Sequence, residues 1–342
     1  MSQANPPKVS IIIKAWNEEA HIEAAIRSAL SGIDVVGGEV ILADSVSTDA
    51  TVEIARKYPV TIVQLKHVGD RRCGAGPQLG YQVARGDYIY ILDGDMELDA
   101  GFLPAALAAL EADSRLAGVA GLVEERSTAS YEFRGRKRRN TEGVAGDTRW
   151  LDMGGLYRRS ALRQVGYLSN RNLHAFEEME LGLRLTNAGW RLRRLPIRSV
   201  AHHGYTEGNW LLLKRRWRSR YLDGSGEVLR ASLGKPFFID VAMTQKHLFV
   251  GLALWLGMIA GLLLLPLTPW LLLGSGAAVA ILVIWRLTRS GSVMDAVFGQ
   301  VVWQVASIAM VRGFFTAPAD PGEPIEHVKL TSIDLPAGQI RP

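Results

Sequence analysis

Apolar and polar positions follow a regular order along residues 9–123. Short runs rich in Val and Ile predict β-strands, and the segments between them carry apolar residues at the spacing of a helix with one buried face. Ser47, Thr48 and Asp49 can cap the first turn of one such helix. The predicted strands are 9–15, 40–43, 61–65, 88–92 and 117–123, and the predicted helices are 18–30, one opening at 47, 76–84 and 99–112.

This alternation predicts an α/β fold: a Rossmann-like, mostly parallel sheet with flanking helices on both faces. Ligands of such sheets bind at the carboxyl ends of the strands, so polar residues at those ends are the first candidates for a site. Farther along, residues 176–188 fit a helix that Gly189 ends, and a short basic strand follows.

The last third of the chain is different in character. Residues 248–285 contain no charged side chain, and Pro266 and Pro269 divide them. A membrane-crossing helix needs about 20 apolar residues, so the stretch predicts two crossings, at about 248–266 and 269–286, in preference to a pair of core helices. Residues 293–315 are amphipathic and predict an interfacial helix, which we favour, or a third crossing.

The charges around these crossings predict their orientation. Lys and Arg residues precede the first crossing and follow the second, whereas the turn between them has none. The positive-inside rule therefore places both ends in the cytoplasm. The sequence thus predicts a cytoplasmic α/β domain at 1–235, an α-helical membrane region at 236–316 and a loose tail at 317–342.

Composition narrows the choice of partner. The chain has 342 residues and a formal charge of +5, which suits phosphate-bearing ligands, an acidic membrane face or nucleic acid. The basic run at 134–139 is a solvated loop or a loop that binds phosphate or lipid headgroups. Because no aromatic residues interleave with it, we expect no nucleic-acid partner. The single cysteine, Cys73, excludes an internal disulfide.

One stretch, "YILDGDMEL", ends a predicted strand with several acids. Asp93 and Asp95 flank Gly94, and two carboxylates so close repel each other unless a cation or hydrogen bonds stabilise them. Oxygen ligands of this kind suit Mg²⁺ or Mn²⁺ bridging the phosphates of a nucleotide. A polar turn is the alternative.

Other polar residues add to this stretch. Asp44 also ends a predicted strand, where it can reach a base or a ribose. Glu177 and Glu178 enter a predicted helix, either to complement its dipole or to offer a general base with a raised pKa. His202 and His203 follow the basic strand, as exposed loop residues or as ligands that complete a metal site.

The blocks "SIIIKAWNEE", "ADSVSTDAT", "ARGDYIYILDGDMEL", "GGLYRRSALRQVGYL" and "FEEMELGLRLTNAGW" occur in an order and spacing that resemble the family 2 glycosyltransferases of the GT-A fold. The resemblance covers roughly residues 8–220, and the predicted membrane pair looks like that of bacterial inner-membrane members that build lipid-linked or exported polysaccharides. It implies that a sugar is transferred, with inversion, from a nucleotide-sugar donor (usually a UDP-sugar).

The resemblance also implies roles for particular residues. Asp93 would lie near the ribose and phosphate, Asp95 would bind Mg²⁺ or Mn²⁺ and Glu178, or else Glu177, would deprotonate the acceptor hydroxyl. The remaining implied contacts are Ala15, Asn17, Glu18 and Asp44 with the nucleotide, Gly154 and Gly155 with the acceptor, and His202 or His203 with the metal or phosphate.

Departures from the family pattern bear on function. The usual double Asp after the second strand is Ala43-Asp44-Ser45, and the usual Glu-Asp pair is Glu177-Glu178. The Gln-x-x-Arg-Trp of processive enzymes is present only as "LKRRW", in which Arg216 and Trp217 can still contact diphosphate or acceptor. This favours addition of a single sugar to a lipid-linked or saccharide acceptor. The alternatives are a processive polysaccharide synthase and a non-catalytic nucleotide-sugar-binding assembly protein.

Overall fold

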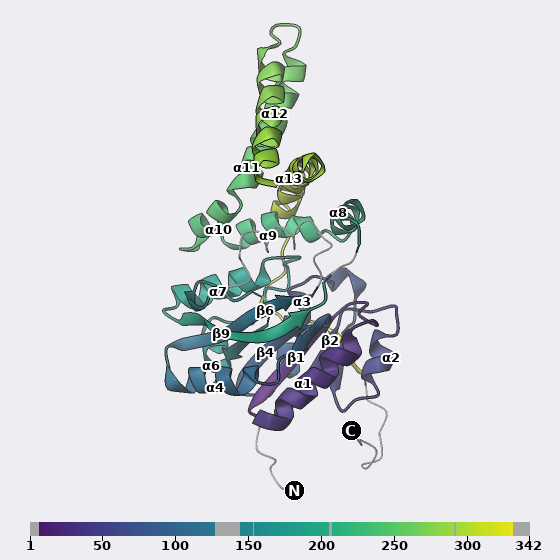
Figure 1. Ribbon diagram of the computed structural model, residues 1–342, viewed down its shortest axis with the longest axis vertical. Helices are drawn as coiled ribbons and strands as arrows, with labels where there is room; N and C mark the ends of the chain where they lie inside the picture. Colours follow the sequence, from purple (N-terminus) through teal and green to yellow (C-terminus); the bar gives the residue numbers. More distant parts are fainter. Residues whose placement is uncertain (1–6, 127–143, 153, 205–206, 291, 331–342) are drawn as a thin grey trace. The chain divides into compact units, whose positions relative to one another are not determined.

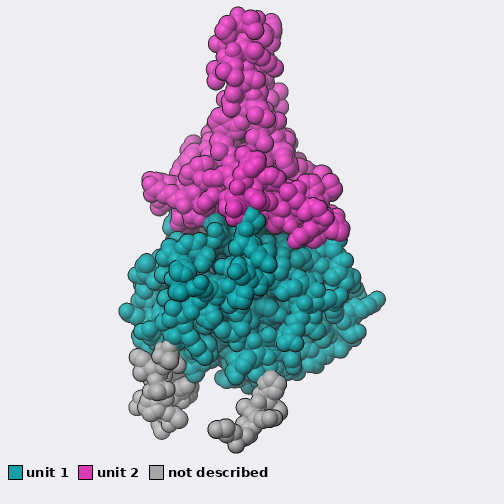
Figure 2. Space-filling view, turned by 180° about the vertical axis from the view of Figure 1, so that it is seen from behind, with its two compact units in different colours: residues 1–208, 318–342 teal, residues 209–317 magenta. Residues whose placement is uncertain are grey.

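The computed structural model describes residues 7–126, 144–152, 154–204, 207–290 and 292–330. The chain forms two compact units, coloured separately in Figure 2: Met1–Gly208 with Pro318–Pro342, and Asn209–Ala317. The sequence placed this boundary at residue 235. The structure places it earlier, because the short helices after residue 208 pack onto the last long helix of the second unit. The basic run at 134–139 lies outside the described residues.

The described part of the first unit is built on one ten-stranded sheet (Figure 1), ordered β10-β3-β2-β1-β4-β8-β6-β9-β5, with β7 paired to β9. Its strands are β1 (Val9–Ala15), β2 (Gly38–Asp44), β3 (Thr61–Leu65), β4 (Tyr88–Asp93), β5 (Met96–Leu98), β6 (Leu116–Glu125), β7 (Gly146–Thr148), β8 (Gly155–Arg158), β9 (Arg191–His202) and β10 (His327–Leu330).

Strand directions confirm an α/β sheet with a parallel centre. β3, β2, β1 and β4 are parallel neighbours, and β6 and β9 are parallel to each other. The antiparallel strand β8 lies between β4 and β6, while β5, β7 and β10 pair antiparallel at the edges. The sheet is therefore mixed outside its centre.

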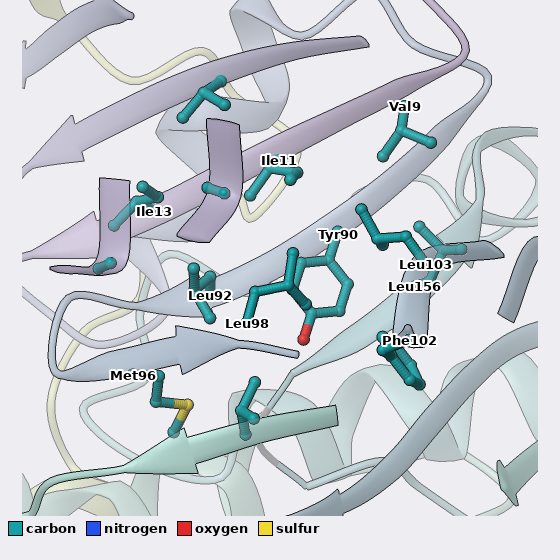
Figure 3. Close-up of a cluster of buried hydrophobic side chains, with 14 of the residues drawn as sticks. Val9, Ile11, Ile13, Tyr90, Leu92, Met96, Leu98, Phe102, Leu103 and Leu156 are labelled. Atoms are coloured by element: carbon teal, nitrogen blue, oxygen red, sulfur yellow. The ribbon is translucent and has the colours of Figure 1, made fainter. Parts of the chain in front are cut away.

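Helices cover both faces of the sheet, as the sequence predicts. On one face α1, α2 and α4 pack on β1 and β4, where Ile11, Ile13, Tyr90 and Phe102 are fully buried (Figure 3). On the other face α3, α6 and α7 pack around Ile12. The helices are α1 (Ile22–Val36), α2 (Thr51–Ala55), α3 (Ala75–Val83), α4 (Phe102–Ala112), α6 (Arg159–Gln164) and α7 (Glu177–Asn187).

The start of the C-terminal tail is ordered against the first unit. β10 pairs antiparallel with β3. Ile325, just before β10, is 1% exposed and belongs to the apolar cluster around Ile12. Asn172 binds the backbone of Ala319 through both of its side-chain polar atoms. This differs from the loose tail that the sequence predicts from residue 317, because an apolar residue and a free sheet edge give residues 325–330 a place to bind.

The described part of the second unit is helical. Three of its helices are long and apolar enough, by length and composition, to cross a membrane: α11, α12 and α13. The sequence favoured two crossings and an interfacial helix at 293–315; α13 meets these criteria of length and composition as well, and the choice between an interfacial helix and a third crossing stays a prediction. The helices are α8 (Asn209–Arg218), α9 (Gly224–Ala231), α10 (Phe238–Thr244), α11 (Lys246–Leu263), α12 (Trp270–Ser290) and α13 (Val293–Phe314).

A buried ion pair joins α13 to the short helices of its own unit. Asp223 is 0% exposed, and its carboxylate accepts hydrogen bonds from Arg312 of α13 and from Arg220. Gly226 of α9 lies so close to α13 that an added Cβ would be 1.8 Å from the carbonyl oxygen of Met310. This packing is why residues 209–235 belong to the second unit.

Candidate functional site

The predicted polar residues meet at one edge of the sheet. β1 lies between β2 and β4, and its register pairs Ala15 with Asp44 and Lys14 with Asp93. The carboxyl ends of three parallel strands therefore bring these residues together, as the α/β rule predicts.

Lys14 is the centre of the resulting cluster. Its Nζ lies 3.2 Å from Asp93 Oδ1, 3.1 Å from Glu177 Oε1 and 3.7 Å from Glu178 Oε1. The Glu177 side chain is 7% exposed and that of Glu178 is 23% exposed. Lys14 thus binds one acid from the sheet and two from α7, and Glu178 is the more open of the two glutamates.

Burial and charge shift the pKa values of this cluster. Burial, reinforced by the neighbouring Glu177 carboxylate and opposed by Lys14, raises the pKa of Glu178 to about 8. Burial also raises the pKa of Asp93. Burial alone would lower the pKa of Lys14, but the Asp93, Glu177 and Glu178 carboxylates raise it well above its usual range. A carboxyl that titrates near neutral pH, beside a lysine that stays charged, is suited to general-base chemistry.

The backbone before α7 delivers its acids to the cluster. Phe176 has φ 70°, in the left-handed region that is rare for a residue with a side chain, and α7 begins at the next residue. The third acid of this turn, Glu180, is 1% exposed and pairs with Arg184 at 2.8 Å, while Tyr167 donates to its other oxygen. Glu180 is therefore structural, whereas Glu177 and Glu178 reach Lys14.

Asp95 forms a second cluster with His202, which ends β9. His202 Nε2 is 3.2 Å from Asp95 Oδ2, and its Nδ1 is 2.7 Å from Glu125 Oε2. Burial alone would lower the pKa of His202, but its hydrogen bonds to these two acids raise it to about 10. Beside this cluster, an added Cβ at Gly94 would lie 2.9 Å from Cγ of Glu18, so a side chain there would push the Glu18 side chain aside.

Asp95 and His202 present a carboxylate oxygen and an imidazole nitrogen 3.2 Å apart, and both are donor types that divalent ions accept when the imidazole is neutral. Within the described ranges, no three His, Cys, Asp or Glu side chains form a group that could hold a metal ion by themselves. Mg²⁺ and Mn²⁺, however, usually take only one or two protein carboxylates and complete their shell with water and phosphate oxygens. Glu125 on the far nitrogen of His202 matches the carboxylate that commonly orients a metal-binding imidazole.

The structure separates the two predicted histidines. His203 Nε2 contacts Glu97 at 2.6 Å, and the His203 ring stacks on His21 with 4.6 Å between centroids. Arg126 also pairs with Glu97, at 3.0 Å. Of the two histidines, His202 is therefore the one that faces Asp95.

Asp44 and Asn17 hold the loop after β2. Asp44 is 0% exposed, and its carboxylate accepts hydrogen bonds from Ser47 and from Gln64 Nε2. Asn17 has φ 55° and accepts a hydrogen bond from the backbone N–H of Thr48, while the backbone N–H of Glu18 donates to Thr51. These residues support the rim of the site, and in this arrangement the Asp44 carboxylate serves the loop.

Gly154 and Gly155 lie next to the same sheet edge. Gly154 has φ +75°, and an added Cβ there would be 2.8 Å from the hydroxyl of Tyr90. At Gly155 an added Cβ would be 2.7 Å from the ring of Tyr157. Neither position can take a side chain without movement of its neighbours.

Arg216 and Trp217 belong to α8 in the second unit. The Arg216 guanidinium lies over the ring of Tyr221 at 4.9 Å, and Arg312 lies over the ring of Trp217 at 4.3 Å. In the second unit, Trp217 thus takes part in the packing around Asp223.

Sequence reasoning missed Lys14, Glu125 and the pair Trp16–Arg71. Trp16 follows Ala15, is 37% exposed and lies under the Arg71 guanidinium at 4.6 Å. A lysine within an otherwise apolar strand was an available signal for Lys14. Glu125 gave none, because its partner His202 is 77 residues away along the chain and reaches it only when β9 pairs with β6.

Comparisons with known proteins agree with this fold. The family model described as Glycosyl transferase family 2 matches residues 10–168, which include Asp44, Asp93 and Asp95 and end before α7. Among solved structures, the mannosyltransferase PcManGT of Pyrobaculum calidifontis, in complex with GDP-Man and Mn²⁺, covers 91% of this chain and 86% of its own, with a TM-score of 0.53 and 19% identity. That likeness concerns the fold alone.

Curated relatives are similar over shorter spans. A GalNAc(5)-diNAcBac-PP-undecaprenol beta-1,3-glucosyltransferase of Campylobacter jejuni is 29% identical over 136 residues, which are 38% of this chain and 43% of that protein. The chain thus spans less than half the length of this relative. The putative glycosyltransferase EpsE of Bacillus subtilis is 31% identical over 201 residues, which are 54% of this chain and 69% of EpsE. Together with the family match, this similarity shows that the chain belongs to the family 2 glycosyl transferases.

Proposed function

We propose that this protein transfers a sugar from a nucleotide-sugar, with UDP as the nucleotide, to a lipid-linked or saccharide acceptor, with inversion and with the help of a divalent metal. The observation that carries the proposal is the Lys14-centred cluster of Asp93, Glu177 and Glu178 at the carboxyl edge of the parallel strands.

Glu178 acts as the base. Its carboxylate takes the proton of the acceptor hydroxyl while the hydroxyl oxygen forms a bond to the anomeric carbon from the face opposite the diphosphate. The bond between that carbon and the diphosphate oxygen breaks, and its electrons leave with the nucleoside diphosphate. Glu178 suits this role better than Glu177, because it is 23% exposed against 7% and its pKa is raised to about 8.

Asp95 and His202 would hold the metal ion, and Asp93 would lie beside the ribose and phosphate. A divalent ion bound there neutralises charge on the departing diphosphate. Lys14 forms ion pairs with both Asp93 and Glu177, and it contributes positive charge near the leaving group. Asn17 and Glu18 border the nucleotide from the end of β1, with Trp16 as a flat, half-exposed surface beside them.

Gly154 and Gly155 leave room for the acceptor to approach the donor. A lipid-linked acceptor agrees with the three helices α11, α12 and α13 and with the undecaprenol-linked substrate in the name of the Campylobacter jejuni relative. The Lys and Arg residues on both sides of 248–285 support a bacterial inner-membrane location with the first unit in the cytoplasm.

A donor screen tests this proposal. The full-length protein in detergent is incubated with labelled UDP- and GDP-sugars, bacterial membrane lipid extract and Mn²⁺ or Mg²⁺, and both free nucleoside diphosphate and labelled lipid are measured. We expect transfer that EDTA abolishes, and NMR of the product should show an inverted anomeric centre. Transfer that survives EDTA would refute the metal role, and a retained anomeric configuration would refute inversion.

Glu178→Gln tests the base against a matched control. Loss of a general base lowers kcat by about 10²–10⁴-fold. The control is Glu111→Gln, which removes an exposed carboxylate whose partner is Lys8 at 2.9 Å, and it should stay within about twofold of the parent. A Glu178→Gln protein as active as this control would overturn the assignment of the base.

A further inference from the structure

A group of polar side chains is buried among the long helices of the second unit. Arg286 of α12 is 9% exposed, and its guanidinium lies over the ring of Trp303 of α13 at 3.7 Å. Its Nε donates to Gln300 Oε1 at 3.3 Å, and Gln300 is 4% exposed. Gln304 lies one helical turn further along α13. We call the three side chains of Arg286, Gln300 and Gln304 the Arg286 cluster.

Part of this cluster has unused hydrogen-bonding capacity. The Nε2 atom of Gln300 and both side-chain polar atoms of Gln304 are buried and have no hydrogen-bond partner in the described part of the chain. Buried amide groups without partners are costly, and in native proteins nearly all of them bind a protein group, ordered water or an ion. The donors here stand beside a buried guanidinium, so together they are suited to an anion.

The cluster lies where the end of α12 and the start of α11 meet the middle of α13. Arg286 is in the last two turns of α12, and His247, the second residue of α11, has its ring 5.2 Å from that of Trp303. Trp285 and Arg289 flank the cluster, with the Arg289 guanidinium over the Trp285 ring at 4.4 Å. Trp with Lys or Arg at the end of an apolar helix marks the depth of lipid headgroups.

We propose that the Arg286 cluster binds the phosphate monoester of a membrane lipid. The Arg286 guanidinium and the amide N–H groups of Gln300 and Gln304 supply donors to phosphate oxygens, and the Gln304 carbonyl oxygen accepts from a protonated phosphate oxygen or a neighbouring hydroxyl. Arginine suits this role because its planar fork matches phosphate, and basic pockets between membrane helices bind lipid headgroups. This inference does not depend on the proposed sugar transfer.

The test is the rise of the thermal unfolding midpoint of the full-length protein in detergent when a phosphate ligand is added. Dioleoyl phosphatidic acid is the probe, dioleoylglycerol is its phosphate-free counterpart and inorganic phosphate is the free-anion arm. We expect phosphatidic acid to raise the midpoint and dioleoylglycerol to leave it unchanged. An equal rise with inorganic phosphate would overturn the lipid as ligand and assign the site to a free anion, and an equal rise with dioleoylglycerol would overturn any role of the phosphate.

Matched variants locate the effect. Arg286→Gln should raise the phosphatidic acid concentration for a half-maximal shift by about tenfold or more, whereas Arg289→Gln, which removes an exposed arginine of the same helix, should stay within about twofold. Gln300→Leu keeps the bulk of the side chain and should weaken binding severalfold, and it serves if Arg286→Gln does not fold. Unchanged ligand-induced shifts in Gln300→Leu, or equal losses in Arg286→Gln and Arg289→Gln, would refute the site.

Discussion

Replacing Lys14 by Met removes the one positive charge at the centre of the carboxylate cluster while keeping much of its shape. Lys14 Nζ lies 3.7 Å from Glu178 Oε1. At that distance two unit charges attract by about 4 kcal/mol with an effective dielectric constant of about 20. Since one pKa unit corresponds to about 1.4 kcal/mol, the attraction sets an upper limit of about three units for the rise in the Glu178 pKa. We expect a rise of about one to three units.

The consequence for catalysis depends on pH. With a pKa of about 8, roughly a tenth of the Glu178 side chains are ionised at pH 7. A further rise of one unit leaves about a hundredth, so kcat/KM of Lys14→Met at pH 7 should fall by about tenfold or more. The deficit should shrink as the pH rises towards 10, because the parent base is then already almost fully ionised while the ionised fraction of the variant still grows.

The assay is the pH profile of kcat/KM for sugar transfer between pH 6 and 10. Lys8→Met is the matched control, because it removes a lysine just before the same strand whose partner, Glu111, is exposed. Its profile should coincide with that of the parent protein. A Lys14→Met profile that is lower by the same factor at every pH, with an unmoved midpoint, would refute the reasoning that Lys14 sets the pKa of Glu178.

Three further predictions concern stability. The pKa of Glu178 is raised to about 8 from an ordinary 4.5, so ionisation of this side chain destabilises the fold increasingly from pH 5 to pH 8. Glu178→Gln should therefore raise Tm more at pH 8 than at pH 5. An equal gain at both pH values would contradict this. Glu180→Ala leaves Arg184 as a buried unpaired charge and should cost about 3–5 kcal/mol in urea unfolding, whereas a cost below about 1 kcal/mol would show that the pair is dispensable. Ending the chain after Pro324 removes Ile325 and β10 and should cost roughly 2–3 kcal/mol by the same method, with no change refuting the docking of the tail.

The sequence predicts the parallel half of the fold well because the pattern there is local. The strands expected at 9–15 and 61–65 have those bounds in the structure, and the other expected strands differ only by a few residues at their ends. In each of them Val and Ile supply the buried runs that a sheet covered on both faces requires. Gly189, with φ +89°, follows the end of α7, as the glycine signal predicts.

What the sequence does not predict is pairing over long distances. β8 lies antiparallel between β4 and β6, and β10 reaches β3 across most of the chain; neither follows from a local pattern. The same limit applies to the site. Asp93 and Asp95 were recognisable as a pair, yet their separate partners, Lys14 and His202, come from β1 and β9 and depend on how the sheet is assembled.

Lys14 shows how a local pattern and the assembled fold combine. Side chains alternate between the faces of a strand, so Ile11 and Ile13 of β1 point to the face of α1 and α4, and Ile12 and Lys14 point to the other face. On that face α7 delivers Glu177 to within 3.1 Å of Lys14. Moving the lysine one residue along β1 would bury it against the apolar side of α1 and leave the three carboxylates without their cation. The strand period therefore decides which layer of helices can supply the acids of the site, and α7 is the helix of that layer that begins with them.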